Sequence, residues 1–129
     1  MSAAPVSYSE RVLALFRSLP RAGGVKPGEG TVVVGEAIAL DRAAWVRFEA
    51  RVQNGRVADS AFRAFGCPHT LAAAALVTEA LPERPLADAL SLDAGRLARE
   101  LGVPAEKMGR LLVVEDALRA LIGGAPRVQ

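Results

Sequence analysis

The sequence contains little cysteine, few aromatic residues and no long apolar run. With one cysteine in 129 residues, no disulfide can form within the chain, and a reducing cytosol is the simplest setting. We therefore expect a cytoplasmic protein. No apolar stretch approaches the roughly 18 residues that a membrane-spanning helix needs. The start of the chain also lacks the basic residues and the apolar run of a secretory signal.

An excess of charge of one sign is lacking as well. The 16 basic and 14 acidic residues give a net charge of +2, and Lys and Arg are scattered without a run. This pattern predicts no nucleic-acid partner and no polybasic contact with a membrane. The length of 129 residues and the 51% of hydrophobic residues predict one folded domain over residues 1–129. The elements and the family resemblance described below place its ordered core at about residues 8–122. Because aromatics are only 5%, Ala, Leu and Val must fill most of that core.

Three consecutive segments have the pattern of β-strands. Residues 31–36 are short and β-branched, and residues 44–52 alternate between an inward apolar set and a set that mostly faces water. Asn54-Gly55 favours positive φ at both positions of a type I′ turn, and residues 56–65 form the returning strand. The sequence thus predicts a three-stranded antiparallel sheet.

Helical patterns stand on both sides of these strands. We expect a first helix at residues 9–19, stopped by Pro20 and Gly23-Gly24, and a second from Pro68 to about Leu81. The inward face of the second helix is predicted to consist of Leu71, Ala74, Ala75, Thr78 and Leu81.

The C-terminal half continues as helices. A short turn at residues 86–90 precedes a helix that Asp93 caps and that ends at Gly102. The inward stripe of the last helix is predicted to be Met108, Leu111, Leu112, Leu118 and Ile122. Strands grouped first and helices grouped later predict an α+β fold, with helices packed on one face of the sheet.

Cys67 lies where the last strand gives way to a helix. Unpaired backbone N–H groups and the positive end of the helix dipole favour a thiolate there, which is the form that binds metal or accepts sulfur. A lone cysteine in a small domain is also commonly a small buried hydrophobe. One thiolate is a poor metal site, because zinc takes four ligands and a cluster takes several cysteines. Cys67 is therefore the one candidate ligand for a metal or cofactor, and both interpretations stay open.

Two neighbouring features have alternative interpretations. His69 follows Cys67 by two residues, and helix positions two apart face different directions, so we expect a surface or partner-facing histidine rather than a shared ligand. Trp45, on the polar face of its strand, either marks a contact surface or lies under the loop before it. No glycine-rich phosphate loop, Ser/His/Asp order or paired carboxylates are present, so the chain is not expected to be an enzyme.

The order of several motifs resembles the IscU/NifU iron–sulfur scaffold family. Residues 62–67 read as a strand that ends in an aromatic residue, a glycine and Cys67, and a Leu-Val-Thr-Glu segment follows at 76–79. Further matches are Tyr8 to Val12, Pro20-Arg21, Asn54 to Val57 with Asp59, Leu86 with Ala89-Leu90, and Glu115 to Ala117. The resemblance covers roughly residues 8–122 and implies the α+β fold of that family.

The resemblance also implies a ligand set that this chain largely lacks. Members of the family receive sulfur from a cysteine desulfurase, assemble a 2Fe–2S cluster with three cysteines and an aspartate, and pass it on with chaperone help. Cys67 matches the middle cysteine. The other family positions fall at Arg42 (or Asp41), Ala44 and Gly109-Arg110, and the chaperone-recognition stretch reads Val103 to Lys107 with one proline and the lysine kept. Arginine offers no lone pair to a metal, so we expect no stable cluster or zinc on one copy of the chain.

Three functions are compatible with these features. The first is an accessory or degenerate scaffold that docks to iron–sulfur assembly partners, such as a cysteine desulfurase, without holding a stable cluster. The second is a working scaffold or sulfur acceptor that uses Cys67, with a homodimer as one way to share a cluster. The third is a small-anion-binding module in which Arg42 and Arg110 converge near Cys67 at a helix N-terminus.

Overall fold

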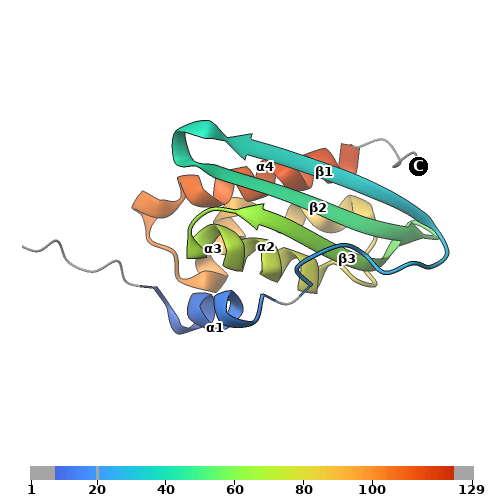
Figure 1. Ribbon diagram of the computed structural model, residues 1–129, viewed down its shortest axis with the longest axis horizontal. Helices are drawn as coiled ribbons and strands as arrows, with labels where there is room; N and C mark the ends of the chain where they lie inside the picture. The colour runs from blue at the N-terminus through green and yellow to red at the C-terminus, as the bar shows by residue number, and fades with distance from the viewer. Residues whose placement is uncertain (1–7, 20, 124–129) are drawn as a thin grey trace, which may run out of the picture.

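The computed structural model describes residues 8–19 and 21–123 (Figure 1). The elements follow the predicted order of helix, strands and helices. They are α1 (Glu10–Ser18), β1 (Thr31–Ala39), η1 (Leu40–Arg42), β2 (Ala44–Gln53), β3 (Arg56–Phe65), α2 (Pro68–Ala80), η2 (Leu86–Ser91), α3 (Ala94–Leu101), η3 (Ala105–Lys107) and α4 (Gly109–Gly123). The expected stop at Pro20 lies outside the described residues. No helix in the described ranges is long and apolar enough to cross a membrane.

The three strands form an antiparallel sheet in the order β1-β2-β3, as predicted. Asn54 and Gly55 have φ values of 55° and 76°, so the turn between β2 and β3 has the type I′ signs that its sequence favours. β1 is longer than predicted and runs to Ala39, because its pairing with β2 continues through Ile38 and Trp45. This extension brings the start of η1 to the same end of the sheet as Cys67.

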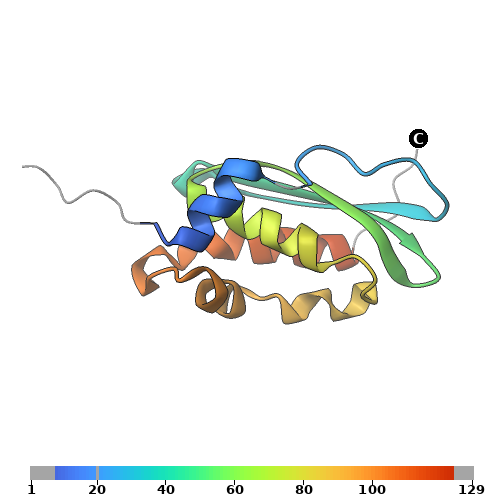
Figure 2. The same cartoon turned by 90° about the horizontal axis from the view of Figure 1, so that it is seen from below.

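The helices cover one face of the sheet, as the α+β prediction requires. α2 and α4 lie directly against it, α3 and η2 form a further layer behind them, and α1 packs along α2 (Figure 2). α4 approaches β1 most closely at Gly35, where an added Cβ would lie 2.0 Å from the Leu121 backbone nitrogen. Among the residues that the structure describes, the loop at 21–30 lies on the opposite face of the sheet, and no helix covers that face (Figure 1).

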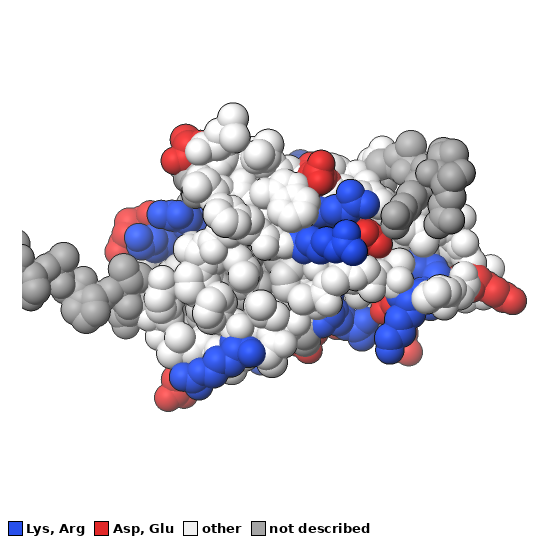
Figure 3. Space-filling view, in the orientation of Figure 1, with Lys and Arg blue, Asp and Glu red and all other residues white. Residues whose placement is uncertain are grey.

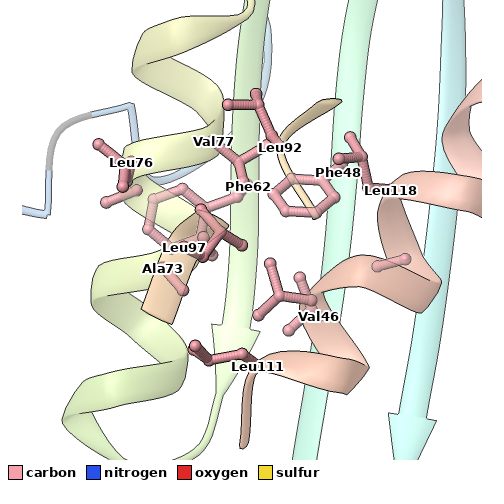
Figure 4. Packing of buried hydrophobic residues seen from close by; sticks show 14 of the residues in the cluster. Val46, Phe48, Phe62, Ala73, Leu76, Val77, Leu92, Leu97, Leu111 and Leu118 are labelled. Carbon is pink, nitrogen blue, oxygen red and sulfur yellow. The ribbon is translucent and has the colours of Figure 1, made fainter. Parts of the chain in front are cut away.

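The core lies between the sheet and these helices. Phe48 and Phe62 are cross-strand partners on β2 and β3, and both are fully buried. Leu97 of α3 and Leu118 of α4 lie beside them, and Leu111 of α4 lies closer to Val46 (Figure 4). Alanine and leucine fill most of the remaining space, as the low aromatic content predicted.

Two burial predictions were wrong. α2 has no single inward face: nearly all of its side chains from His69 to Thr78 are buried, because the helix is packed against the sheet, α1 and α4. Leu112, predicted to point inward, is exposed on α4, and Val113 and Val114 are buried in its place. On β2 the outward set faces water for the most part, as predicted, and Glu49 is its buried member.

The helix caps connect distant parts of the chain. Ser9 caps α1 by accepting the Val12 N–H at 3.2 Å, and its hydroxyl donates to the Leu101 carbonyl at 2.5 Å. At the start of α3, Asp93 accepts the Arg96 N–H at 2.9 Å, and Gly102 ends that helix with φ of 65°, both as predicted. The Ser9 bond joins the first helix to the end of the third.

Candidate functional site

Cys67 is half-buried at the N-cap of α2, directly after β3. Its sulfur lies 3.7 Å from the Thr70 hydroxyl, which donates to the Arg110 carbonyl at 3.4 Å. Thr70 therefore links the start of α2 to the start of α4. Gly66 permits this close arrangement, since a Cβ there would lie 3.1 Å from the Thr70 Cβ. The prediction of a thiol at a strand-to-helix junction is confirmed.

The side chains around Cys67 do not fit a metal or a cluster. Within residues 8–19 and 21–123, no group of three or more His, Cys, Asp and Glu side chains could hold a metal ion. Ala44 contributes a buried methyl group where the family resemblance calls for an aspartate. Arg110 has no lone pair to offer, and the side chain of Arg42 lies outside the described part of the structure. A 2Fe–2S cargo or a zinc ion would find one thiol here and no complete ligand set.

His69 does not lie at the surface, and this prediction was wrong. The side chain is 2% exposed, and its ring packs against Tyr8 with the centroids 4.8 Å apart and the planes at 54°. Burial lowers the pKa of His69, and the charges of Lys107 and Arg110 lower it further. The helical spacing predicted only that His69 faces another direction than Cys67. It could not show that α1 covers that side of α2.

The buried neutral His69 predicts a pH-dependent stability. Its folded pKa lies below its unfolded value of about 6.5, so the unfolded chain binds a proton first as the pH falls. The stabilisation is complete above the unfolded pKa and is lost as the pH falls through the folded pKa. We expect the melting temperature of the protein to fall as the pH is lowered from 7.5 to 5.5. In His69→Gln the melting temperature should depend less steeply on pH. Equal slopes for the two proteins, measured by thermal unfolding in matched buffers, would contradict this assignment.

An apolar surface lies beside Cys67 at the same end of the sheet. Ile38, Leu40 and Phe65, which we call the site-end patch, are 64%, 83% and 65% exposed. They border a groove of about 200 Å³ that Ala39, Ala43, Ala44 and Trp45 also line. Figure 3 shows this end of the outer sheet face as a broad uncharged area. Exposed large apolar side chains that gather in one place mark an interaction site more often than scattered ones do.

Trp45 and two arginines frame the site-end patch. The Trp45 indole donates to the Glu36 carboxylate at 3.0 Å, which holds the ring over the outer face of the sheet next to the η1 loop. Arg47 and Arg63 are cross-strand partners on the same face. The Arg47 Nε, 3.5 Å from a Glu49 carboxylate oxygen, is buried without a hydrogen-bond partner. Glu36 is the β1 partner of Arg47, so the patch is bounded by charged residues of both signs, a feature that the sequence pattern alone did not indicate.

The remaining predicted residues lie around this end of the molecule. The segment from Val103 to Lys107 contains η3, with Pro104 at its N-cap, and Lys107 is close enough to influence His69. Arg110 meets the Cys67 region through its backbone carbonyl. The predicted convergence of Arg42 and Arg110 on an anion stays a prediction, because the Arg42 side chain is not described.

The fold and this site define a class: a small α+β domain with one antiparallel sheet, helices on one face and a cysteine at the strand-to-helix junction. Residues 7–125 match the NifU-like N terminal domain, and the chain belongs to that family. The predicted resemblance is thereby confirmed.

Curated relatives cover nearly the whole chain. The iron-sulfur cluster assembly scaffold protein IscU of Haemophilus influenzae is 26% identical over 118 residues, spanning 91% of this chain and 94% of its own length. The protein of the same name from Azotobacter vinelandii is 27% identical over 121 residues, covering 91% and 92%. This chain is therefore similar to these two proteins over more than nine tenths of their length.

Solved structures confirm the fold. A putative iron-sulfur cluster assembly scaffold protein for the SUF system from Fervidobacterium islandicum AW-1 aligns with a TM-score of 0.73 at 16% identity, over 89% of this chain and 96% of that one. The N-terminal part of a nitrogen-fixing NifU-like protein from Brucella abortus aligns with a TM-score of 0.56 at 14% identity, covering 88% and 79%. At these identities the likeness concerns the fold alone.

Proposed function

We propose that this protein is an accessory form of an iron–sulfur cluster assembly scaffold. It docks to assembly partners, a cysteine desulfurase among them, and does not hold a stable 2Fe–2S cluster or a zinc ion on one copy. It acts in the cytoplasm as a binding protein rather than as an enzyme. The observation that carries the proposal is that the described residues offer one thiol, Cys67, and no group of three or more side chains that could hold a metal ion.

The docking half of the proposal has separate support. The site-end patch places three large apolar side chains in water beside Cys67, with Arg47 and Arg63 along its border. Such a surface suits a partner that presents apolar side chains with charged residues around them. Membership of a family whose relatives are named as iron–sulfur assembly scaffolds supports an assembly protein as that partner.

Anaerobic reconstitution tests the cluster half. After incubation with iron and sulfide, we expect a folded, colourless protein with far less than one iron per chain and no visible absorption of a cluster. Near-stoichiometric iron that disappears in Cys67→Ser would overturn the proposal and restore a working scaffold. A member of the same family that has all three cysteines and the aspartate, treated in parallel, controls for the reconstitution itself.

A capture assay with a purified cysteine desulfurase tests the docking half. We expect Leu40→Asp, within the site-end patch, to weaken binding at least tenfold. Leu90→Asp is the matched control, because Leu90 is also an exposed leucine but lies in η2, next to the far end of the β2–β3 hairpin. Equal binding by both variants would remove the patch as the docking surface. No binding by the unaltered protein would remove the docking half altogether.

A further inference from the structure

The loop at residues 21–30 arches away from the outer face of the sheet before it enters β1 (Figure 2). A cavity of about 570 Å³ lies where this loop meets β1 and β2. The loop supplies one wall, and Glu49 and Arg51 of β2 contribute to the other. Ligand sites commonly have volumes of roughly 300–1,000 Å³, so the cavity has room for a small molecule. It lies toward the β2–β3 hairpin, whereas Cys67 and the site-end patch lie at the other end of the sheet.

The loop wall of this cavity is held in place by side chains of the sheet. The Arg51 guanidinium donates from Nε to the Lys26 carbonyl at 3.2 Å and from Nη1 to the Glu29 carbonyl at 2.9 Å. The Lys26 N–H donates to the Asp59 carboxylate at 2.8 Å. Gly28 lies against the same guanidinium, because an added Cβ would be 2.5 Å from the Arg51 Cζ. The cavity is therefore formed by the fold itself, as ligand sites usually are.

Charged side chains of both signs line the cavity. Glu49 is 4% exposed, and Lys26 and Arg51 carry positive charge into the same space. Glu49 is in ionic contact with Arg47, but at 3.5 Å the Arg47 Nε makes no hydrogen bond within the described residues. A carboxylate accepts several hydrogen bonds, so this contact does not exhaust Glu49 as an acceptor. Arg51 gives two of its N–H groups to the loop and has others to offer a ligand.

We propose that the cavity binds a small zwitterion of the dipeptide class, with its ammonium group toward Glu49 and its carboxylate toward Lys26 and Arg51. A ligand without the ammonium group would bring a second carboxylate to a buried one, and a ligand without the carboxylate would face two cations. A ligand with both groups complements both. Val25, Pro27 and Val32 also line the cavity and suit aliphatic side chains on such a ligand.

Calorimetric titration of the full chain with L-alanyl-L-leucine tests the proposal. We expect saturable binding of one dipeptide per chain. N-acetyl-L-alanyl-L-leucine lacks the ammonium group, and L-alanyl-L-leucinamide lacks the carboxylate. Each of these two analogues should bind at least tenfold more weakly than the dipeptide, because each leaves one charged side of the cavity without a partner.

Two substitutions assign the charges to residues. In Glu49→Gln the dipeptide and its acetylated analogue should bind equally, since the preference for a free ammonium group is lost. In Lys26→Gln the preference for a free carboxylate should fall at least threefold. Lys26 is exposed, so this variant keeps the test open if thermal unfolding shows that Glu49→Gln does not fold. Glu36→Gln is the matched control, because Glu36 is an exposed carboxylate of β1 outside the cavity lining, and it should bind the dipeptide unchanged.

Three results would overturn the proposal. The first is no binding of the dipeptide by the unaltered chain at millimolar concentration. The second is equal binding of the dipeptide and both analogues, and the third is retention of both charge preferences in the cavity variants. Leu40→Asp separates this site from the docking patch, because Leu40 lies in η1 and does not line the cavity. It should bind the dipeptide normally, so failure of desulfurase docking and failure of this site can be distinguished.

Discussion

Gly35→Ala is expected to destabilise the protein strongly, because α4 rests on the backbone of β1 at this residue. A Cβ there would lie 2.0 Å from the Leu121 nitrogen, 2.4 Å from its Cα and 2.5 Å from the Ala117 carbonyl oxygen. All three are backbone atoms, so no side-chain rotation relieves the overlap, and β1 and α4 must separate. Overpacking of this kind lowers the free energy of unfolding by about 3 kcal/mol or more. For a chain of this size, that corresponds to a fall of roughly 10 °C in melting temperature.

Gly95→Ala is the matched control for this substitution. Gly95 lies in α3, where an added Cβ would meet its nearest neighbours at 3.5 Å, an ordinary contact distance. Alanine is the better helix former, so this change should leave the melting temperature unchanged or raise it slightly. Chemical unfolding of the three proteins compares the free energies directly. Similar stability of Gly35→Ala and the unaltered protein would show that α4 does not rest on β1 as described.

Phe62→Ala is the second substitution with a large expected effect. Phe62 is fully buried between the sheet and α2, opposite Phe48 on the neighbouring strand. Removing its ring leaves a cavity that the surrounding alanines are too small to fill. We expect a loss of about 3–5 kcal/mol in the free energy of unfolding. This is a large part of the total free energy of unfolding of a domain of this size.

Phe65→Ala controls for the loss of a phenylalanine from the same strand. Phe65 is 65% exposed at the end of β3, so its removal should change the free energy of unfolding by less than about 0.5 kcal/mol. It should nevertheless weaken capture by the desulfurase, because Phe65 belongs to the site-end patch. Urea unfolding of both variants would contradict the core assignment if their losses of stability were equal.

Local patterns predicted the sheet and the helix ends well. Alternation along β2, the Asn54-Gly55 turn and the Asp93 and Gly102 caps all depend on neighbouring residues, and each was found as predicted. Burial on α2 and α4 was predicted less well. A helical stripe shows one buried face, but α2 is covered from several directions by elements far away in the sequence. This information lies in the tertiary packing and not in the periodicity.

The candidate site was predicted in part for the same reason. The position of Cys67 followed from a strand pattern that gives way to a helix pattern, and the lost ligand positions followed from a family resemblance. The burial of His69 depends on Tyr8, about sixty residues earlier in the chain. The site-end patch combines Ile38 and Leu40 with Phe65, which become neighbours only when β1, β2 and β3 pair. No local signal in the sequence brings these residues together.

The hydrogen bond from the Ser9 hydroxyl to the Leu101 carbonyl has a consequence for folding during synthesis. The two residues are 92 positions apart, so α1 leaves the ribosome long before its anchor on α3 exists. At synthesis rates of about 5–20 residues per second, the interval is of the order of 5–20 s. The apolar side of α1, with Val12 and Leu15, packs on α2 in the folded protein. Until α2 has been synthesised, no helix covers that side. Helices translated later, α2 and α3, therefore complete the environment of the first, and until they appear the nascent chain exposes an apolar helix face.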